Sequence, residues 1–170
     1  MELGDPIAQY NRALIYLNDN EGVKNESRAV ELLEKSANKG YVNAMYKLGI
    51  YYISKKQVLK NLHKALEYFN KAAEKGHVSA QVCLGNCYYE GEGVTKDYEE
   101  AVKWYRKAAD KGNVVAQNNL ANRYKRGEGV IRDTSEASRL YNLSADSGYE
   151  LAQQNLLILC EAEGKWWAEA

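Results

Sequence analysis

Small and apolar side chains recur along the chain at a constant period of 36 residues. An alanine marks each copy, and in most copies a leucine and a tyrosine follow it four and eight residues later. A spacing of four places side chains on one face of an α-helix, so this stripe predicts an amphipathic helix. The columns are Ala8, Ala44, Ala80, Ala116 and Ala152, then Leu48, Leu84, Leu120 and Leu156, then Tyr16, Tyr52, Tyr88 and Tyr124.

A second apolar stripe follows in each copy and closes on a glycine. In the third copy it consists of Ala101, Trp104 and Tyr105. Gly91-Glu92-Gly93 separates the two stripes, because glycine adopts the positive φ values that end a helix. Asp97-Tyr98-Glu99-Glu100 has the spacing of a capping box, which predicts the start of a second helix. Each copy therefore reads as a helix, a short loop and an antiparallel helix. The closing glycines are Gly40, Gly76, Gly112 and Gly148.

The period predicts an all-α fold built from about four and a half repeats. A single repeat cannot bury its own apolar stripes, so neighbouring repeats must stack into an α-solenoid. We expect a single repeat domain over residues 1–170, with a right-handed superhelix of antiparallel helix pairs. Its repeats are 5–40, 41–76, 77–112 and 113–148, followed by a single helix and tail over 149–170. The predicted helices are 6–18, 25–39, 42–55, 61–75, 78–90, 97–111, 114–126, 133–147 and 150–163.

The third copy carries a motif that resembles the Sel-one-like repeat family, a branch of the tetratricopeptide superfamily. The motif reads Ala80-x3-Leu84-Gly85-x2-Tyr88-x2-Gly91-x-Gly93-Val94-x2-Asp97-x3-Ala101-x2-Trp104-Tyr105-x-Lys107-Ala108-Ala109-x2-Gly112. The first two copies depart from it in the loop, where Asp19 and Glu21, then Lys55 and Gln57, replace the paired glycines. The resemblance implies an adaptor that binds other proteins, and some family members are immunity proteins against toxins. A secreted branch has a disulfide in each repeat, where this chain has Ala37, Ala73, Ala109 and Ala145.

Charge and composition exclude several other classes of protein. The chain has 23 basic and 23 acidic side chains, so it lacks the basic surface that a phosphate backbone attracts, and nucleic acid is not an expected partner. No apolar run reaches the length that spans a bilayer, so membrane insertion is not expected. The N-terminus lacks the pattern of a signal peptide, which favours the cytoplasm. A mature secreted chain with its signal removed would read the same way.

The sequence holds no set of residues that predicts catalysis, a metal or a cofactor. Its Gly-x-Gly loops lie between two helices, whereas a phosphate-binding loop follows a strand. No serine-histidine or cysteine-histidine-acid set stands out, so we expect a protein that is not an enzyme. Cys83 and Cys87 share a helical face and could offer two thiolates to a metal. Burial as small apolar side chains is the alternative that we favour for them.

Positions two, six and nine residues after each first-helix alanine lie opposite the core stripe. In tetratricopeptide-like stacks the first helices line a concave groove, and the resemblance implies the same here. These positions are apolar in the first half of the chain, where a solvated face should be polar, which is typical of an interface. Amides follow in the second half, where Asn118, Asn119, Asn122 and Arg123 could clamp a backbone or a carboxylate. The predicted partner-binding residues are Tyr10, Leu14, Tyr46, Ile50, Ile53, Val82, Asn86, Tyr89, Asn118, Asn122 and Lys125. The alternative is that this row meets neighbouring helices.

These patterns together predict a protein–protein interaction scaffold or adaptor. It would bind another protein or peptide in the groove of the first helices. Two alternatives stay open: an immunity or inhibitor protein that blocks a toxin or enzyme, and an architectural segment of a longer protein. The last helix has apolar residues on all sides. We expect Trp166 and Trp167, or a second copy in a homodimer, to cover it.

Overall fold

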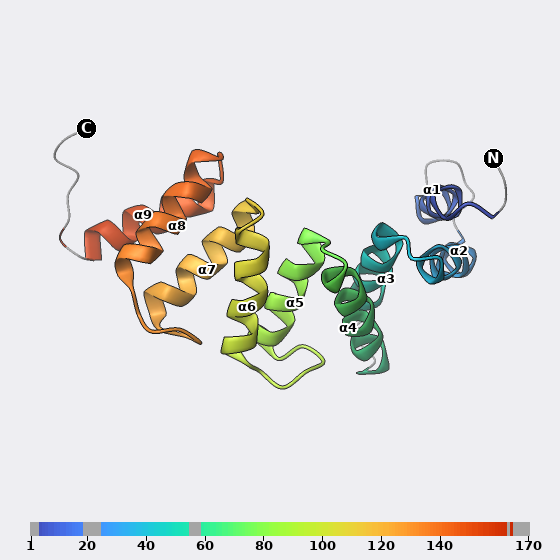
Figure 1. The fold of residues 1–170 in the computed structure, drawn as a ribbon, viewed down its shortest axis with the longest axis horizontal. Coiled ribbons are helices and arrows are strands. Elements are labelled where there is room, and N and C mark those ends of the chain that lie inside the picture. Colours follow the sequence, from blue (N-terminus) through green and yellow to red (C-terminus); the bar gives the residue numbers. More distant parts are fainter. Residues whose placement is uncertain (1–3, 19–24, 55–58, 163, 165–170) are drawn as a thin grey trace. The chain divides into compact units, whose positions relative to one another are not determined.

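The computed structural model describes residues 4–18, 25–54, 59–162 and 164, and in this part of the chain it contains nine α-helices and no strand. The all-α prediction is confirmed, and every predicted helix boundary lies within two residues of the observed one (Figure 1). The first loops of copies one and two, with Asp19, Glu21, Lys55 and Gln57, lie outside the described residues. The helices are α1 (Pro6–Leu17), α2 (Glu26–Asn38), α3 (Val42–Ser54), α4 (Leu59–Glu74), α5 (Val78–Glu90), α6 (Tyr98–Ala109), α7 (Val114–Arg126), α8 (Thr134–Asp146) and α9 (Glu150–Ala162).

The chain forms two compact units, residues 1–80 and residues 81–170, with the boundary inside α5. In the first unit α1 packs on α2, α2 on α3 and α3 on α4. In the second unit α6 packs on α7, α7 on α8 and α8 on α9. Helices that are consecutive in sequence are thus neighbours in space, as expected of stacked repeats. The single domain and the right-handed superhelix concern the whole chain, and both stay predictions.

Side chains at the helix starts fix where each helix begins. Asp97 and Asp133 each accept a hydrogen bond at 2.9 Å from the backbone N–H three residues later, in Glu100 and Glu136. Asp5 caps α1 in the same way, and Pro6 follows in the first turn. These bonds satisfy N–H groups that have no partner inside the helix. The capping box predicted in the third copy therefore supplies its Asp cap, and Asp133 supplies the same cap in the fourth copy.

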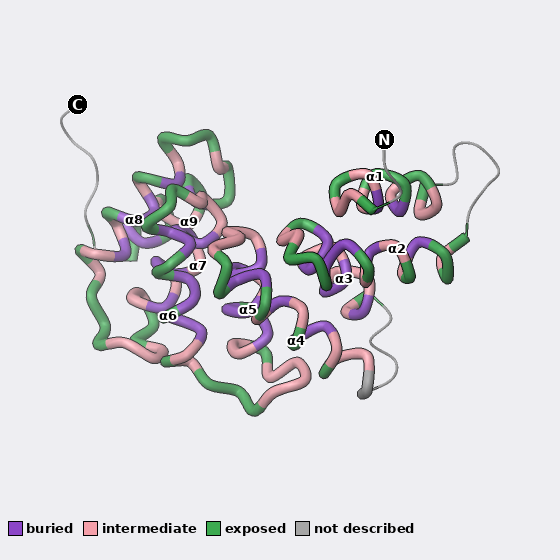
Figure 2. The backbone as a smooth tube through the Cα atoms, turned by 45° about the vertical axis from the view of Figure 1, so that its right-hand side comes forward, coloured by how far each residue is buried: buried purple, intermediate pink, exposed green. Residues whose placement is uncertain are grey.

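The recurring columns form the core within each unit (Figure 2). Ala44, Ala116 and Leu84 are completely or almost completely buried. Two buried rings lie directly on glycines of the first helices. A Cβ added at Gly49 would lie 2.5 Å from the ring of Phe69, and one at Gly85 would lie 2.5 Å from the ring of Tyr105. Glycine at this column lets the two helices of a repeat approach closely.

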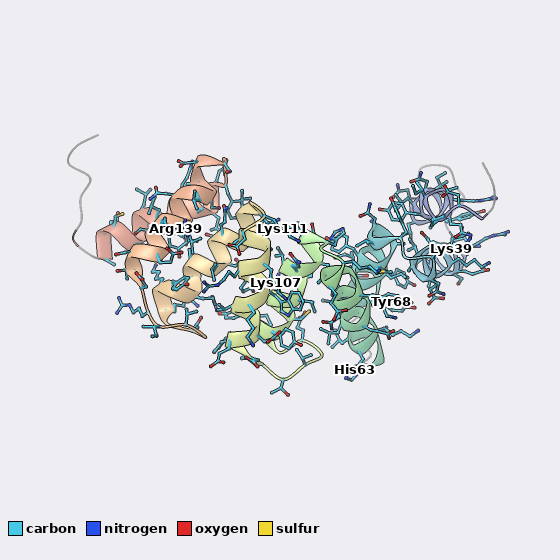
Figure 3. The ribbon with its side chains drawn as sticks, in the orientation of Figure 1. Lys39, His63, Tyr68, Lys107, Lys111 and Arg139 are labelled. Atoms are coloured by element: carbon cyan, nitrogen blue, oxygen red, sulfur yellow. The ribbon has the colours of Figure 1, made fainter. Side chains whose placement is uncertain are left out.

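Aromatic rings on the second helices also contact cationic side chains, and Figure 3 labels Lys107 on α6 and Tyr68 on α4. On α6, the Lys107 ammonium lies 3.9 Å from the centre of the Trp104 ring. On α4, the Tyr68 ring stacks on the ring of Tyr52 at 5.9 Å, and burial is the first cause that raises the pKa of Tyr68 to about 12. These rings serve as packing surfaces, as their recurrence predicts.

The last helix, α9, is buried on one side only. Leu159 and Cys160 are buried, whereas Leu157 is 58% exposed and Ile158 and Leu151 are also exposed. Trp166 and Trp167, which we expect to cover this face, lie outside the described residues. Cover by the tail and a homodimer through α9 both stay predictions. No helix in the described residues is long and apolar enough to span a membrane.

Candidate protein-binding surfaces

A polar hollow of about 390 Å³ lies in the second unit, between α5, α6 and α7. Its centre is a pair of asparagines on successive first helices, Asn86 on α5 and Asn119 on α7. The hollow is lined by Asn86, Tyr89, Glu90, Glu92, Tyr105, Asn119 and Arg123. We call it the asparagine hollow.

The Asn86 amide is held from two sides and still has free hydrogen-bonding capacity. Its Oδ1 accepts from the Tyr105 hydroxyl at 2.8 Å and from Asn119 Nδ2 at 3.3 Å. Neither Asn86 Nδ2 nor Asn119 Oδ1 is bonded to any described residue. Because an amide group carries two donors and an acceptor, the pair offers N–H groups beside a carbonyl oxygen. The hollow can therefore both donate to and accept from one bound group.

The next repeat uses its asparagines differently. Asn122 lies 36 residues after Asn86, and its Oδ1 accepts from the Tyr141 hydroxyl at 2.8 Å. However, its Nδ2 donates to the Asn118 carbonyl at 3.1 Å, and Asn118 Oδ1 accepts from Asn155 Nδ2 at 2.8 Å. Asn122 and Asn155, which correspond to Asn86 and Asn119, therefore both donate to Asn118 rather than to each other.

Arg123 forms a rigid wall of the hollow. It is only 6% exposed, and its guanidinium carbon lies 3.8 Å from the centre of the Tyr89 ring. Its Nη1 lies 2.5 Å from Glu128 Oε2, so a carboxylate of the chain neutralises it. Arg126 Nη1 donates to the Tyr89 hydroxyl at 3.4 Å. The predicted role of Arg123 as a free clamp for a carboxylate does not fit this ion pair.

The predicted partner-binding row is therefore only partly open to solvent. The expectation that its members are solvated is wrong for Val82, which is 8% exposed, and for Asn118, which is 1% exposed. Asn118 is buried because it receives the α9 amide Asn155. Tyr46 is half-buried, with its ring stacked on the His77 ring at 4.4 Å. Asn86 is exposed, and the half-buried members are Tyr10, Leu14, Tyr46, Ile50, Ile53, Tyr89, Asn122 and Lys125. Whether any of them binds a partner stays a prediction.

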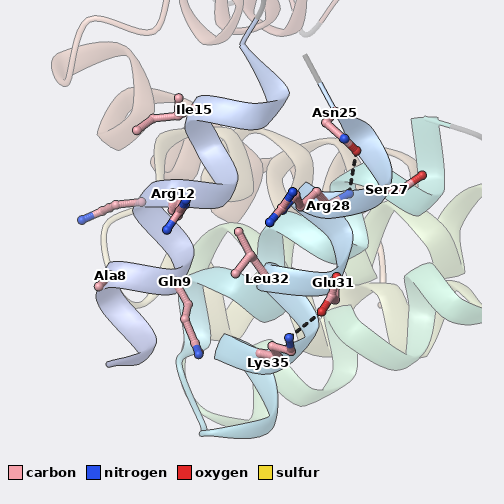
Figure 4. Close-up of a pocket in the computed structure, with 11 residues that line it drawn as sticks. Ala8, Gln9, Arg12, Ile15, Asn25, Ser27, Arg28, Glu31, Leu32 and Lys35 are labelled. Carbon is pink, nitrogen blue, oxygen red and sulfur yellow. Dashed lines mark hydrogen bonds and ion pairs between the residues drawn. The ribbon is translucent and has the colours of Figure 1, made fainter. Parts of the chain in front are cut away.

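A larger hollow, of about 800 Å³, lies between α1 and α2 in the first unit (Figure 4). In Figure 4, Leu32 lies between the two helices and Arg28 points toward α1. Sequence reasoning missed this hollow. A signal was available, because Arg12 stands in the column that holds leucine in the later repeats. The lining residues are Ala8, Gln9, Asn11, Arg12, Ile15, Asn25, Ser27, Arg28, Glu31, Leu32 and Lys35.

The cysteines are not arranged as a metal site in the described residues. Cys87 and Cys160 are buried and Cys83 is half-buried, and none of the three is part of a disulfide. Burial is the first cause that raises the pKa of Cys87 to about 12, which disfavours the thiolate that a metal requires. The described residues contain no group of three or more His, Cys, Asp or Glu side chains suited to a metal ion.

The repeat units coincide with a known repeat family. The model of the Sel1 repeat matches residues 6–41, 42–77, 78–113 and 114–149. The chain belongs to the Sel1 repeat family. Each matched unit contains one first helix and one second helix, in the register that the 36-residue period predicts.

Solved structures of Sel1 repeat proteins are similar to this chain. A protective antigen of uropathogenic Escherichia coli with an SLR fold is 35% identical, with a TM-score of 0.83 over 88% of this chain and 32% of that one. A Sel1 repeat protein from Oxalobacter formigenes is 33% identical, with a TM-score of 0.85 over 95% of this chain and 64% of that one. The chain thus spans about a third of the first protein and just under two thirds of the second. A comparison with curated proteins gives no match.

Cysteine rich protein B of Helicobacter pylori is a more distant relative of this Sel1 repeat chain. It is 26% identical, with a TM-score of 0.59 over 75% of this chain and 96% of that one. Sel1 repeat proteins are generally protein-interaction scaffolds, and the repeat is a non-catalytic scaffold type.

Proposed function

We propose that this Sel1 repeat protein is an interaction scaffold that holds an extended segment of a partner protein in the asparagine hollow. The observation that supports this is the open amide pair of Asn86 and Asn119. An extended polypeptide presents N–H and C=O groups along its length, and each of them needs a partner when it leaves water. Asn119 Oδ1 is a suitable acceptor for a backbone N–H, and Asn86 Nδ2 is a suitable donor to a C=O.

The held geometry of Asn86 favours such binding. The Tyr105 hydroxyl at 2.8 Å fixes Asn86 Oδ1 as the acceptor, so Asn86 Nδ2 is directed away from that bond. Tyr105 itself is buried and cannot swing away without breaking its packing on Gly85. A side chain that is already ordered loses less entropy when it binds a ligand. The Tyr89 ring, held beneath Arg123, adds an apolar wall for a side chain of the partner.

A peptide selection followed by backbone methylation tests this proposal. Peptides would be selected from a random displayed library on the full chain, and the best one synthesised with a single N-methyl group at each successive amide. N-methylation removes one donor and leaves the side chains unchanged. We expect one or two positions at which it weakens binding by about tenfold, since a lost hydrogen bond in a desolvated site costs about 1–3 kcal/mol.

Replacing both Asn86 and Asn119 with Ala should weaken the unmodified peptide to a similar extent and should abolish the effect of methylation at those positions. Asn38→Ala, which removes an exposed amide from α2, is the matched control and should bind normally. Equal binding by the double variant and the wild-type chain would contradict the proposal. Selection of no peptide at all would favour the architectural alternative, and loss of an enzyme's activity upon mixing would favour the inhibitor.

A further inference from the structure

The hollow between α1 and α2 points to a second docking surface, separate from the asparagine hollow. We propose that it takes an acidic amphipathic helix of a partner protein. Three observations carry this inference: what covers the same face in later repeats, which apolar side chains it exposes, and its charge. All of them lie within the described residues.

In later repeats this face is covered by a helix. The residues of the fourth repeat that correspond to Ala8, Arg12 and Leu32 are Ala116, Leu120 and Leu140. All three are buried, and the preceding second helix, α6, packs against α7. Arg106 of α6 donates from Nη2 to the Tyr124 hydroxyl of α7 at 2.6 Å. In the first unit α2 packs against α3 in the corresponding position. The face is therefore shaped by the repeat to receive a helix.

In the first repeat the same face is open. Ile15 is 52% exposed, whereas Cys87 and Leu159, its counterparts in later repeats, are buried. Ala8 and Leu32 are half-buried, although their counterparts in the fourth repeat are fully covered. No described helix lies on this face. Exposed apolar side chains that line a hollow favour an apolar ligand face.

The charge of the hollow selects the kind of helix. Arg12, Arg28 and Lys35 line it together with a single carboxylate, that of Glu31. The carboxylate is already engaged, because Lys35 Nζ lies 2.5 Å from Glu31 Oε1, and this contact is the first cause that lowers the pKa of Glu31. The Arg12 and Arg28 guanidinium groups lie 6.0 Å and 5.9 Å from the centre of the Tyr16 ring. Neither forms an ion pair with a carboxylate of the described chain.

The contacts between α2 and α3 show where acidic residues of such a helix would lie. The Tyr52 hydroxyl donates to Glu34 Oε1 at 3.3 Å, and the Tyr51 hydroxyl donates to Glu26 Oε2 at 3.4 Å. Tyr52 corresponds to Tyr16, and Tyr51 corresponds to Ile15. A helix docked on the first repeat in the same register would thus bring carboxylates to Tyr16, beside Arg12 and Arg28. Charge complementarity of this kind favours an acidic partner.

The sequence of α2 itself provides a defined probe. A synthetic peptide with the sequence of residues 25–39 would be stapled between positions 27 and 31, which are exposed in α2, and labelled for fluorescence anisotropy. Its exposed basic residues Arg28, Lys35 and Lys39 would be replaced with Gln, so that Glu26 and Glu34 make the peptide acidic. The staple is needed because a free helix of this length is marginal in water. In the intact chain α2 already occupies the face of α3, so the added peptide has the α1–α2 hollow as its binding surface. We expect saturable binding with one peptide per chain.

Reversing the charges of Arg12 and Arg28 to Glu should weaken this binding at least tenfold, and both residues are exposed, so the fold should survive. A peptide with Glu26→Lys and Glu34→Lys should bind the wild-type chain at least tenfold more weakly. The matched control combines Lys75→Glu with Arg132→Glu, two exposed positions outside the hollow, and should bind like the wild type. The chain with Asn86→Ala and Asn119→Ala should also bind normally, which separates this surface from the asparagine hollow.

Raising the salt concentration from about 50 mM to about 500 mM should weaken binding severalfold, because exposed charges are screened within a shorter distance. Three results would overturn the proposal: no saturable binding to the wild-type chain, equal binding by the Arg12→Glu, Arg28→Glu chain, or equal binding of the charge-reversed peptide.

Discussion

The two repeat positions that hold Asn86 and Tyr105 in the third repeat change together from one repeat to the next. Asn86 pairs with Tyr105 in the third repeat, and Asn122 with Tyr141 in the fourth, through hydroxyl–carbonyl bonds of 2.8 Å. In the second repeat the same two columns hold Ile50 and Phe69, and in the first they hold Leu14 and Leu33. A buried hydroxyl needs an acceptor, so a ring with a hydroxyl occurs with an amide and a ring without one occurs with an aliphatic side chain. The residue six positions after each first-helix alanine is thus matched to the side chain that faces it from the second helix of the same repeat.

This pairing predicts a measurable coupling in a double-mutant cycle. Asn86→Ile should lower the free energy of unfolding by about 1–3 kcal/mol, since it leaves the buried Tyr105 hydroxyl without its acceptor. Tyr105→Phe should cost about 1 kcal/mol. The double variant reproduces the pair of the second repeat, so it should cost less than the sum by about 1 kcal/mol in urea unfolding. Tyr105→Phe combined with Asn38→Ile serves as the additive control. Additivity in both pairs would show that the hydrogen bond contributes nothing.

At the scale of helices, α6 has acidic residues at both ends. Asp97 caps the start and accepts from Glu100 N–H, whereas Asp110 is the C-terminal capping residue, where exposed carbonyl groups concentrate negative charge. The same side chain is therefore favourable at one end of the helix and unfavourable at the other. Glu99 and Glu100 in the first turn and Arg106 and Lys107 in the last turn follow the favourable arrangement.

Alanine substitutions at the two ends of α6 should act in opposite directions. Asp97→Ala should reduce the free energy of unfolding by about 1 kcal/mol, since it removes the cap. Asp110→Ala should be neutral or raise stability by a few tenths of a kcal/mol, because it removes a carboxylate from the negative end of the dipole. Thermal melts of the two variants beside the wild type measure this. Equal losses from both substitutions would mean that the position along the helix has no effect.

At the scale of the whole molecule, packing connects neighbouring helices in sequence within each unit. The loop after α7 shows such a contact at close range. Gly129 has a φ of +72°, and a Cβ added there would overlap the backbone carbonyl of Tyr98, at the start of α6. The loop of one repeat therefore rests on the helix of the previous repeat. In a stack of this type, damage should spread to near neighbours before distant ones.

Hydrogen exchange of a Gly129→Ala variant should reveal this locality. The substitution combines a left-handed backbone with a backbone overlap, so we expect faster exchange in α6, α7 and α8 and unchanged exchange in α1 and α2. Gly148→Ala is the control, because its φ of +85° is also left-handed but no atom beyond its two chain neighbours lies within 4 Å of the added Cβ. It should cost about 1–2 kcal/mol from the backbone alone. Uniformly faster exchange along the chain of the Gly129 variant would instead indicate a single cooperative core.

The sequence by itself determined the helices, their pairing and the family. A 36-residue period with alanine, leucine and tyrosine at a spacing of four leaves one consistent solution, because only α-helices bring such positions onto one face. Capping signals such as Asp97 and Asp133 then placed the helix starts within a residue or two. The candidate row of the first helices was also visible, and Asn86 and Tyr89 line a hollow as that row suggested.

Only the tertiary structure decided which polar groups remain open. Asn86, Asn118 and Asn122 read alike in the sequence, yet Asn118 is buried by its bond to Asn155 while Asn86 retains an unused donor. For the hollow beside Arg12, the period showed only that an arginine replaces the recurring leucine, because the openness of the hollow depends on whether another helix covers the face. Periodicity reports the direction of a side chain around its own helix. Burial and bonding depend on contacts with other helices, which that direction alone does not fix.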